Sequence, residues 1–137
     1  MKYKIIFTFI IVSVIFVSCQ QISKTSAQAK ENEQQNTLTY KDITASEFDA
    51  IAKAPNALVI DVRTPEEVSE GKIQEADLFI DFTSDDFEAK IDSLDKNKTY
   101  IVYCKSGGRS AQAAQIMIDK GFKNVYNLQG GISSYQE

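Results

Sequence analysis

The sequence predicts an α/β sandwich built around a mostly parallel sheet. Short apolar runs rich in β-branched and aromatic residues alternate along the chain with segments whose apolar residues recur at helical spacing. Two of these runs, 57–62 and 99–103, are almost continuously apolar, which is typical of strands covered on both faces of a parallel sheet. With 137 residues, of which 43% are hydrophobic and 25% charged, the chain fits one globular domain of ordinary composition.

The folded part is expected to begin near Leu38 and to include an early helix. Thr44 and Glu47 have the spacing of a capping box, in which each residue satisfies a backbone N–H group of the first helical turn. Apolar residues at helical spacing follow, so the helix is predicted to run to about Lys53. A Pro-Asn pair then ends it, and the first apolar strand, 57–62, comes next.

A second short helix is predicted directly after this strand. Thr64 is a suitable cap residue and Pro65 suits the first helical position. Glu66 and Glu67 in the first turn interact favourably with the helix dipole, and Gly71 ends the helix.

The remaining sequence continues the same alternation of strands and helices. Alternating apolar residues predict a strand over 78–82, and apolar residues on one helical face predict a helix over 84–94. The last three elements are expected to be a strand at 99–103, a helix at 110–120 and a strand at 124–128.

The first 18 residues are predicted to be a lipoprotein signal peptide. Two lysines flank the start of an apolar run, residues 5–17, which is shorter than the roughly 18 residues of a confident membrane-spanning helix. Phe16-Val17-Ser18-Cys19 resembles the bacterial lipobox, which implies that Cys19 carries lipid. We therefore expect a lipoprotein anchored in the membrane of a bacterial cell envelope and facing the periplasm. The alternative is an uncleaved anchor in which Cys19 is merely one more apolar residue.

Residues 19–37 are predicted to be a flexible tether between this segment and the domain at 38–137. They are mostly Gln, Ser, Lys, Glu, Asn and Ala, and Ile22 is the only large apolar residue among them. Such a segment buries too little surface to offset the entropy of ordering it.

The composition excludes several classes of function. A formal charge of −4 and a pI near 4.9 argue against nucleic acid as a partner. The chain has no histidine, which excludes Ser-His-Asp and Cys-His catalytic sites and all histidine metal sites. Its two cysteines, Cys19 and Cys104, are too few for a closed thiolate zinc site, so no metal is expected.

The strongest candidate for a functional site is the segment 104–110, Cys-Lys-Ser-Gly-Gly-Arg-Ser. It follows a strand and opens a helix, at the sheet edge where open α/β folds bind their ligands. Its two glycines allow successive backbone N–H groups to turn toward one point, and the helix N-terminus adds partial positive charge there. These groups and a nearby guanidinium would favour the thiolate form of Cys104, which makes it a candidate nucleophile. The alternatives are a buried structural cysteine and an ordinary glycine-rich turn.

Four motifs in the expected order make the chain resemble the rhodanese (sulfurtransferase) family. Residues 104–110 resemble the active-site loop of that family, and 58–67 its first motif, an aliphatic strand that ends in Asp-Val-Arg before a Pro-Glu-Glu helix start. Residues 71–76 and 128–131 resemble its Gly-His-Ile-Pro-Gly-Ala segment and its closing Leu-x-Gly-Gly. The resemblance covers about residues 38–137 and implies a rhodanese-like three-layer sandwich, with helices on both faces of a mostly parallel central sheet.

The resemblance also implies an activity. Cys104 would accept a sulfane sulfur as a persulfide from a small-molecule donor such as thiosulfate or another persulfide, and pass it to a thiol or cyanide. The substrate-binding loop would consist of Lys105, Ser106, Gly107, Gly108 and Arg109. It would act mostly through backbone N–H groups, while Lys105 and Arg109 add positive charge for an anionic donor. No cofactor is expected.

Two other functions stay open. Cysteine-dependent phosphatases and arsenate reductases use a related loop, and a non-catalytic rhodanese-like module would bind a partner. The phosphatases have five residues between cysteine and arginine, whereas Cys104 and Arg109 are separated by four, which favours binding of a single sulfur atom. For Asp61 and Arg63 we favour a structural role, such as pairing of Arg63 with Glu67, over a place in catalysis.

Overall fold

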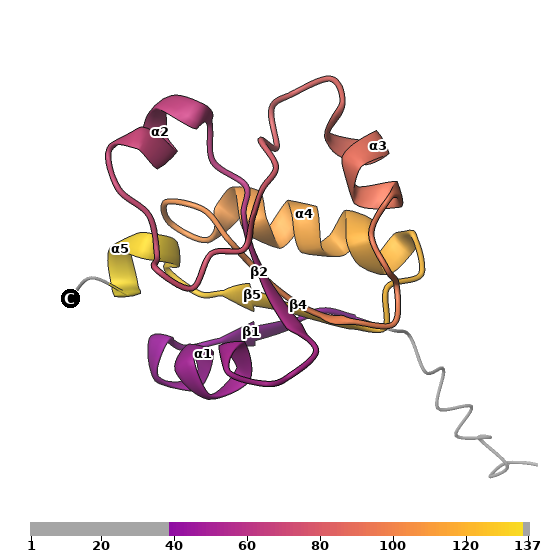
Figure 1. The fold of residues 1–137 in the computed structure, drawn as a ribbon, viewed down its shortest axis with the longest axis horizontal. Coiled ribbons are helices and arrows are strands. Elements are labelled where there is room, and N and C mark those ends of the chain that lie inside the picture. The colour runs from indigo at the N-terminus through magenta and orange to yellow at the C-terminus, as the bar shows by residue number, and fades with distance from the viewer. Residues whose placement is uncertain (1–38, 136–137) are drawn as a thin grey trace, which may run out of the picture. The chain divides into compact units, whose positions relative to one another are not determined.

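The computed structural model describes residues 39–135. The predicted signal peptide, the lipidation of Cys19 and the tether lie outside the described residues. Within them the chain forms one sheet with helices on both faces (Figure 1).

The sheet has five strands in the order β1-β5-β4-β2-β3, and every neighbouring pair is parallel. The neighbours β1 and β5 are not consecutive in sequence, and neither are β2 and β4. Strands β5, β4 and β2 lie in the centre of the sheet, and β1 and β3 lie at its edges. The strands are β1 (Lys41–Ile43), β2 (Ala57–Asp61), β3 (Leu78–Phe79), β4 (Thr99–Tyr103) and β5 (Asn124–Leu128).

Five helices connect or follow the strands. They are α1 (Ala45–Ala52), α2 (Pro65–Ser69), α3 (Phe87–Asp92), α4 (Gly108–Asp119) and α5 (Gly131–Tyr135). Figure 1 shows α4 and α1 on opposite sides of the strands. The predicted three-layer α/β sandwich is therefore confirmed.

Alternate residues of the central strands supply two separate cores. On the face of α3 and α4, strand residues such as Ile60 and Val102 pack with Phe87, Ile91 and Met117. On the other face, the core combines residues of α1, α5, the strands and the loop after α2, namely Ile43, Phe48, Val59, Ile73, Ile101, Tyr103, Leu128 and Ile132. Because both faces are covered, the strands are apolar on both sides, as their sequence predicts.

The predicted capping box of Thr44 and Glu47 is present, and the predicted cap residue Thr64 forms a second capping box with Glu67. The Glu47 carboxylate accepts a hydrogen bond of 2.9 Å from the backbone N–H of Thr44 at the start of α1. At α2, the backbone N–H of Thr64 donates to Glu67 at 3.3 Å, and the N–H of Glu67 donates to the Thr64 hydroxyl at 3.4 Å.

The structure differs from the sequence prediction at two short strands. Strand β1 was not predicted, because it is only three residues long and one of these is buried. The strand expected over 78–82 is reduced to Leu78–Phe79. Its continuation still makes isolated backbone bonds to β2, from Ile80 N–H to Asp61 O at 3.0 Å and from Phe82 N–H to Val62 O at 3.1 Å.

Three helices also differ. The helix expected over 84–94 is shorter, because residues 84–86 form a turn in which the Asp86 side chain accepts from the Ser84 hydroxyl. The helix expected from residue 110 begins at Gly108, since Gly107 adopts the left-handed conformation that ends the loop. Helix α5 was not predicted, and it begins inside the glycine pair 130–131.

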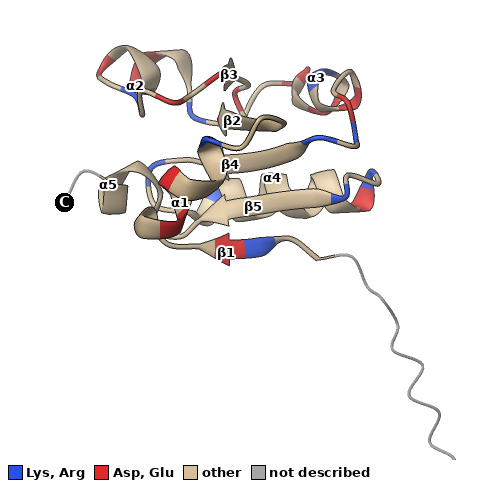
Figure 2. Ribbon diagram, turned by 60° about the horizontal axis from the view of Figure 1, so that its bottom comes forward, with Lys and Arg blue, Asp and Glu red and all other residues tan. Residues whose placement is uncertain are grey.

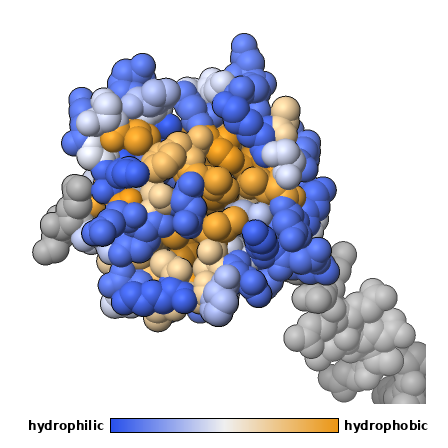
Figure 3. All heavy atoms as spheres, in the orientation of Figure 1, coloured by the Kyte–Doolittle hydropathy of each residue, from blue (hydrophilic) through white to orange (hydrophobic). Residues whose placement is uncertain are grey.

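Charged residues lie mainly outside the central strands, as Figure 2 shows by the largely tan β2, β4 and β5. Figure 3 shows apolar surface on one face of the domain, bordered by hydrophilic side chains. No helix within residues 39–135 has both the length and the hydropathy needed to cross a bilayer.

Candidate functional site

The segment 104–110, called the Cys104 loop below, joins the central strand β4 to the N-terminus of α4. Because all strands are parallel, the loop lies at the same sheet edge as the end of β2, where Asp61 stands. Cys104 is buried, with 1% of its surface exposed. The loop therefore surrounds its thiol with protein groups on most sides.

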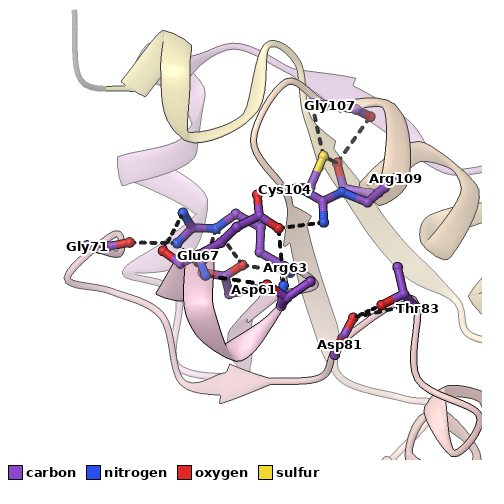
Figure 4. A network of polar contacts seen from close by, with 11 residues as sticks. Asp61, Arg63, Glu67, Gly71, Asp81, Thr83, Cys104, Gly107 and Arg109 are labelled. Carbon is purple, nitrogen blue, oxygen red and sulfur yellow. Dashed lines mark hydrogen bonds and ion pairs between the residues drawn. The ribbon is translucent and has the colours of Figure 1, made fainter. Parts of the chain in front are cut away.

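Backbone and hydroxyl groups of the loop converge on the sulfur (Figure 4). The backbone N–H of Gly107 donates to Cys104 Sγ at 3.2 Å, and Ser110 Oγ lies 3.5 Å from it. Gly107 has φ +94°, and a Cβ atom there would lie 3.0 Å from the backbone nitrogen of Gly130. A larger residue at position 107 would be strained and crowded, so this glycine shapes the loop around the sulfur.

The loop shifts the ionisation of the thiol toward the thiolate. Burial raises the pKa of Cys104, but hydrogen bonds from the Ser110 hydroxyl and from the backbone N–H groups of Ser110, Ser106 and Gly107 lower it. The net effect is a pKa below the ordinary value of a cysteine. This is the direction that the loop sequence predicts.

Helix α5 binds the backbone carbonyls at the start of the Cys104 loop. The backbone N–H of Ile132 donates to Cys104 O at 2.9 Å, and that of Ser133 donates to Lys105 O at 3.1 Å. With their carbonyls fixed in this direction, the following N–H groups of the loop point toward the sulfur. Gly131 permits the approach, because a Cβ atom there would collide with the carbonyl oxygens of Cys104 and Lys105. The closing Leu-x-Gly-Gly motif thus supports the loop.

Arg109 is held by Glu67 of α2. Its two terminal nitrogens donate to the two carboxylate oxygens of Glu67, each at 2.7 Å, with both side chains about a quarter exposed. The guanidinium lowers the pKa of Glu67 to about 2. The pKa of Arg109 is raised, mainly by its hydrogen bonds to Glu67 and to a smaller extent by the charge of Cys104. Arg109 therefore interacts electrostatically with the thiolate.

Asp61 and Arg63 form a buried ion pair, which corrects the partner expected for Arg63. Arg63 was expected to pair with Glu67, but its guanidinium binds the Asp61 carboxylate, with a shortest contact of 2.6 Å and side chains 6% and 0% exposed. The same terminal nitrogen, Nη2, also donates to Gly71 O at 2.8 Å, and the other, Nη1, donates to the backbone oxygen of Glu67 at 3.3 Å. Arg63 therefore ties the end of β2 to the middle of α2 and to the loop that follows it, which is a structural role.

A cavity of ≈ 180 Å³ opens beside the loop. It is lined by Arg63, Glu67, Glu70, Gly71, Lys105, Ile132 and Ser133. Arg63 and Glu67 are already engaged in the pairs described above. Lys105 makes no side-chain hydrogen bond or ion pair within residues 39–135, so its ammonium group can meet an anion that enters the cavity.

The structure brings the predicted loop residues 104–109 together around one thiol. The sequence assigned no individual role in the site to Ser110, Asn127 or Gly131, and Glu67 was expected to favour the start of its helix or to pair with Arg63, not to bind Arg109. For Ser110 a signal was present, since it closes the quoted loop motif. Among the described residues, no group of three or more Cys, Asp or Glu side chains could hold a metal ion.

Comparisons with known proteins identify the domain. The Rhodanese-like domain model matches residues 44–137. A sulfurtransferase from Allochromatium vinosum is 31% identical over 85 residues, which cover 62% of this chain and 77% of that protein. The rhodanese-related protein of Thermoplasma volcanium superposes with a TM-score of 0.61 and 31% identity, over 71% of this chain and 91% of that structure.

A longer relative shares the same region. A tRNA uridine(34) hydroxylase from Sodalis glossinidius is 36% identical over 97 residues, which are 66% of this chain. These residues span only 27% of the hydroxylase, so the similarity concerns one part of that protein.

Proposed function

This chain belongs to the rhodanese-like domain family, and we propose that it is a sulfurtransferase that carries a sulfane sulfur as a persulfide on Cys104. The observation that supports this most directly is the set of N–H and O–H groups that converge on Cys104 Sγ. They stabilise a thiolate without a histidine base, and the chain has no histidine.

The proposed first half-reaction uses thiosulfate as donor. The Cys104 thiolate attacks the outer sulfur, a new S–S bond forms, and the S–S bond of thiosulfate breaks. Sulfite leaves with the electron pair, and the negative charge passes to the outer sulfur of the persulfide. In the second half-reaction a thiolate or cyanide attacks that outer sulfur and regenerates the Cys104 thiolate. No proton has to be removed by a general base in either step.

Charge near the loop suits an anionic donor. Lys105 faces the cavity beside the loop, and the N-terminus of α4 contributes partial positive charge. We assign Lys105 and the backbone of residues 106–108 to donor binding. Arg109 contributes its charge to the thiolate while Glu67 holds it in place.

Two features favour sulfur transfer over phosphate hydrolysis. The Cys104 loop has one residue fewer between cysteine and arginine than the phosphatase loop, which suits a single bound sulfur atom. In addition, both terminal nitrogens of Arg109 already bind Glu67, whereas a phosphatase arginine would have to grip the substrate oxygens.

The decisive experiment is intact mass spectrometry before and after incubation with thiosulfate. A persulfide adds about 32 Da, the mass of one sulfur, and addition of cyanide should remove it as thiocyanate. Cys104→Ser should abolish both results, whereas Cys19→Ser is the matched control and should retain them. Hydrolysis of aryl phosphates without any sulfur adduct would assign the chain to the phosphatases instead. Absence of both reactions would leave a binding module.

We further propose that lipid on Cys19 attaches the protein to a bacterial envelope membrane. The support is the sequence alone: a charged start, a short apolar run and a small residue before the cysteine. Cys19→Ala should release the domain into the soluble fraction or stall signal removal. A variant that stays on the membrane with its signal removed normally would refute this part of the proposal.

A further inference from the structure

A chain of polar contacts leads from Cys104 to the edge strand β1. Ser110 Oγ, which is buried, lies 3.5 Å from Cys104 Sγ and 2.6 Å from Asn127 Oδ1 on β5. The side-chain amide nitrogen of Asn127 donates in turn to Asp42 Oδ1 on β1 at 2.7 Å. Asp42 and Asn127 are direct neighbours in the register of β1 and β5, so their side chains leave the sheet on the same face.

The Ser110 hydroxyl has one proton and several possible acceptors. These are Cys104 Sγ, the backbone oxygen of Gly107 at 3.1 Å, and Asn127 Oδ1. The contact to Asn127 is the shortest of the three. A proton directed to Asn127 is not available to the sulfur, so the two acceptors compete.

Asp42 determines which side of the Asn127 amide faces Ser110. An ionised carboxylate can only accept hydrogen bonds, so the NH₂ group of Asn127 must point to Asp42. The carbonyl oxygen of the amide then points to Ser110. If Asp42 were absent, the amide could turn and donate to Ser110 Oγ, and the Ser110 proton would be free for the thiolate.

We propose that Asp42 is a positioning residue for Cys104. By fixing the Asn127 amide, it keeps an acceptor in front of Ser110 and limits the hydrogen bond that Ser110 gives to the sulfur. A thiolate with fewer hydrogen bonds is the stronger nucleophile, because intrinsic nucleophilicity falls as the thiol becomes more acidic. In the persulfide, the charge lies on the outer sulfur, and Asn127 can accept the Ser110 proton that Sγ no longer attracts.

The other charged groups near the thiol must be separated from this effect. Arg109 of α4 interacts with Cys104, Glu67 of α2 pairs with Arg109, and Lys105 is the next residue in the loop. Asp42 itself is an anion, so any direct effect of its charge would act in the same direction as the contact chain, and the experiment has to separate the two. Only an effect that depends on Ser110 belongs to the contact chain.

The test is a double-mutant comparison read by the pH dependence of iodoacetamide alkylation at Cys104, followed by peptide mass. Ser110→Ala should raise the midpoint by about one pH unit, the effect of one hydrogen bond to a charged group. Asp42→Ala should lower it by roughly half a unit. In the Ser110→Ala background, Asp42→Ala should have no further effect. Asp85→Ala, at an exposed aspartate with no side-chain partner within residues 39–135, is the control for net charge.

Asp42→Asn separates charge from position, because it keeps an acceptor for Asn127 but removes the negative charge. The midpoint should then stay at the value of the unmodified protein. An Asp42→Ala shift that persists in the Ser110→Ala background, or an equal shift in Asp42→Asn, would reduce the role of Asp42 to its charge. Absence of any shift in Asp42→Ala would also overturn the proposal. The inference rests on Cys104 as the proposed nucleophile, but alkylation reads the thiol directly. A failure to form a persulfide would therefore be seen separately.

Discussion

The carboxylate of Glu67 and the guanidinium of Arg109 meet through two parallel hydrogen bonds of 2.7 Å, which join α2 to the first turn of α4. Glu67 also caps its own helix through the backbone of Thr64. One side chain thus fixes both the start of α2 and the arginine of the Cys104 loop.

Glu67→Gln should destabilise the domain by about 1–2 kcal/mol, because it removes a partly exposed, bidentate ion pair. Arg109 lowers the pKa of Glu67 from 4.5 to about 2 in the folded domain. A carboxyl whose pKa is lowered by folding stabilises the fold above its unfolded pKa and loses that contribution as pH falls through its folded pKa. The difference in free energy of unfolding between the two proteins should therefore be constant above about pH 5 and shrink between pH 4.5 and 2.

Urea unfolding at several pH values measures this difference. Glu66→Gln is the matched control, since Glu66 lies in the same helical turn, is exposed and has no side-chain partner within residues 39–135. If both variants had the same pH profile, the Glu67–Arg109 pair would contribute nothing measurable.

Gly131→Ala should both destabilise the domain and open the loop. The new Cβ would collide with the carbonyl of Cys104 and lie 2.6 Å from that of Lys105, at a position with φ +58°. We expect a loss of at least about 2 kcal/mol and, at a pH well above the ordinary cysteine pKa of about 8.5, faster alkylation of Cys104 because the thiol becomes more accessible. Gly121→Ala is the comparison, because Gly121 has φ +89° and open space around it, so it measures backbone strain alone. Equal effects of the two substitutions would mean that α5 can move away without cost.

Arg63→Met should be among the most destabilising substitutions, costing about 3–5 kcal/mol, because it leaves the fully buried Asp61 without its counter-charge. Adding Asp61→Asn removes that uncompensated charge, so the double variant should be more stable than Arg63→Met alone. Chemical denaturation gives both values. In the double variant, the pH midpoint of Cys104 alkylation should be unchanged. A shifted midpoint would contradict a purely structural role for this pair.

Lys105→Gln should raise the KM for thiosulfate roughly threefold at low salt, because one exposed charge that faces the anionic donor is lost. The difference should fade as the ionic strength rises. Lys98→Gln, at the opposite end of the sheet, provides a control for the loss of one positive charge. An equal rise in KM for both variants would place the donor elsewhere.

The parts of the fold that could be predicted are those whose sequence pattern is dictated by burial. Strands β2, β4 and β5 are buried on both faces, so their sequences are apolar runs. The two helix starts are marked by a cap residue and a glutamate three positions later, so their signal is local in the sequence. Strand β1 has one buried residue, so its pairing with β5 rests mainly on backbone hydrogen bonds that any sequence can make, with one side-chain contact between Asp42 and Asn127. Helix α5 begins at glycines, which are poor helix formers, and it exists because its N–H groups find the carbonyls of the Cys104 loop.

In the candidate site, local sequence indicated the loop but not the partners of its side chains. The N–H groups around Cys104 follow from the glycines and the helix start, which lie within a few residues of the thiol. Glu67 and Arg109 are 42 residues apart, and Asn127 is 17 residues from Ser110, so their contacts depend on how α2 and β5 are placed in three dimensions. Arg63 had two carboxylates within reach in the sequence, and only the packing of β2 shows that the buried Asp61 binds it.

The contacts of α5 also set an order of events during synthesis. The Cys104 loop leaves the ribosome more than twenty residues ahead of the N–H groups of Ile132 and Ser133 that fix its carbonyls. Until those residues emerge, the carbonyls of Cys104 and Lys105 lack the donors that fix them, and only the glycines of the loop and the start of α4 shape the surroundings of the sulfur. The loop thus gains its last support late, together with the closing of the fold, so a chain interrupted before residue 131 would carry the loop sequence without the contacts that hold its first two carbonyls.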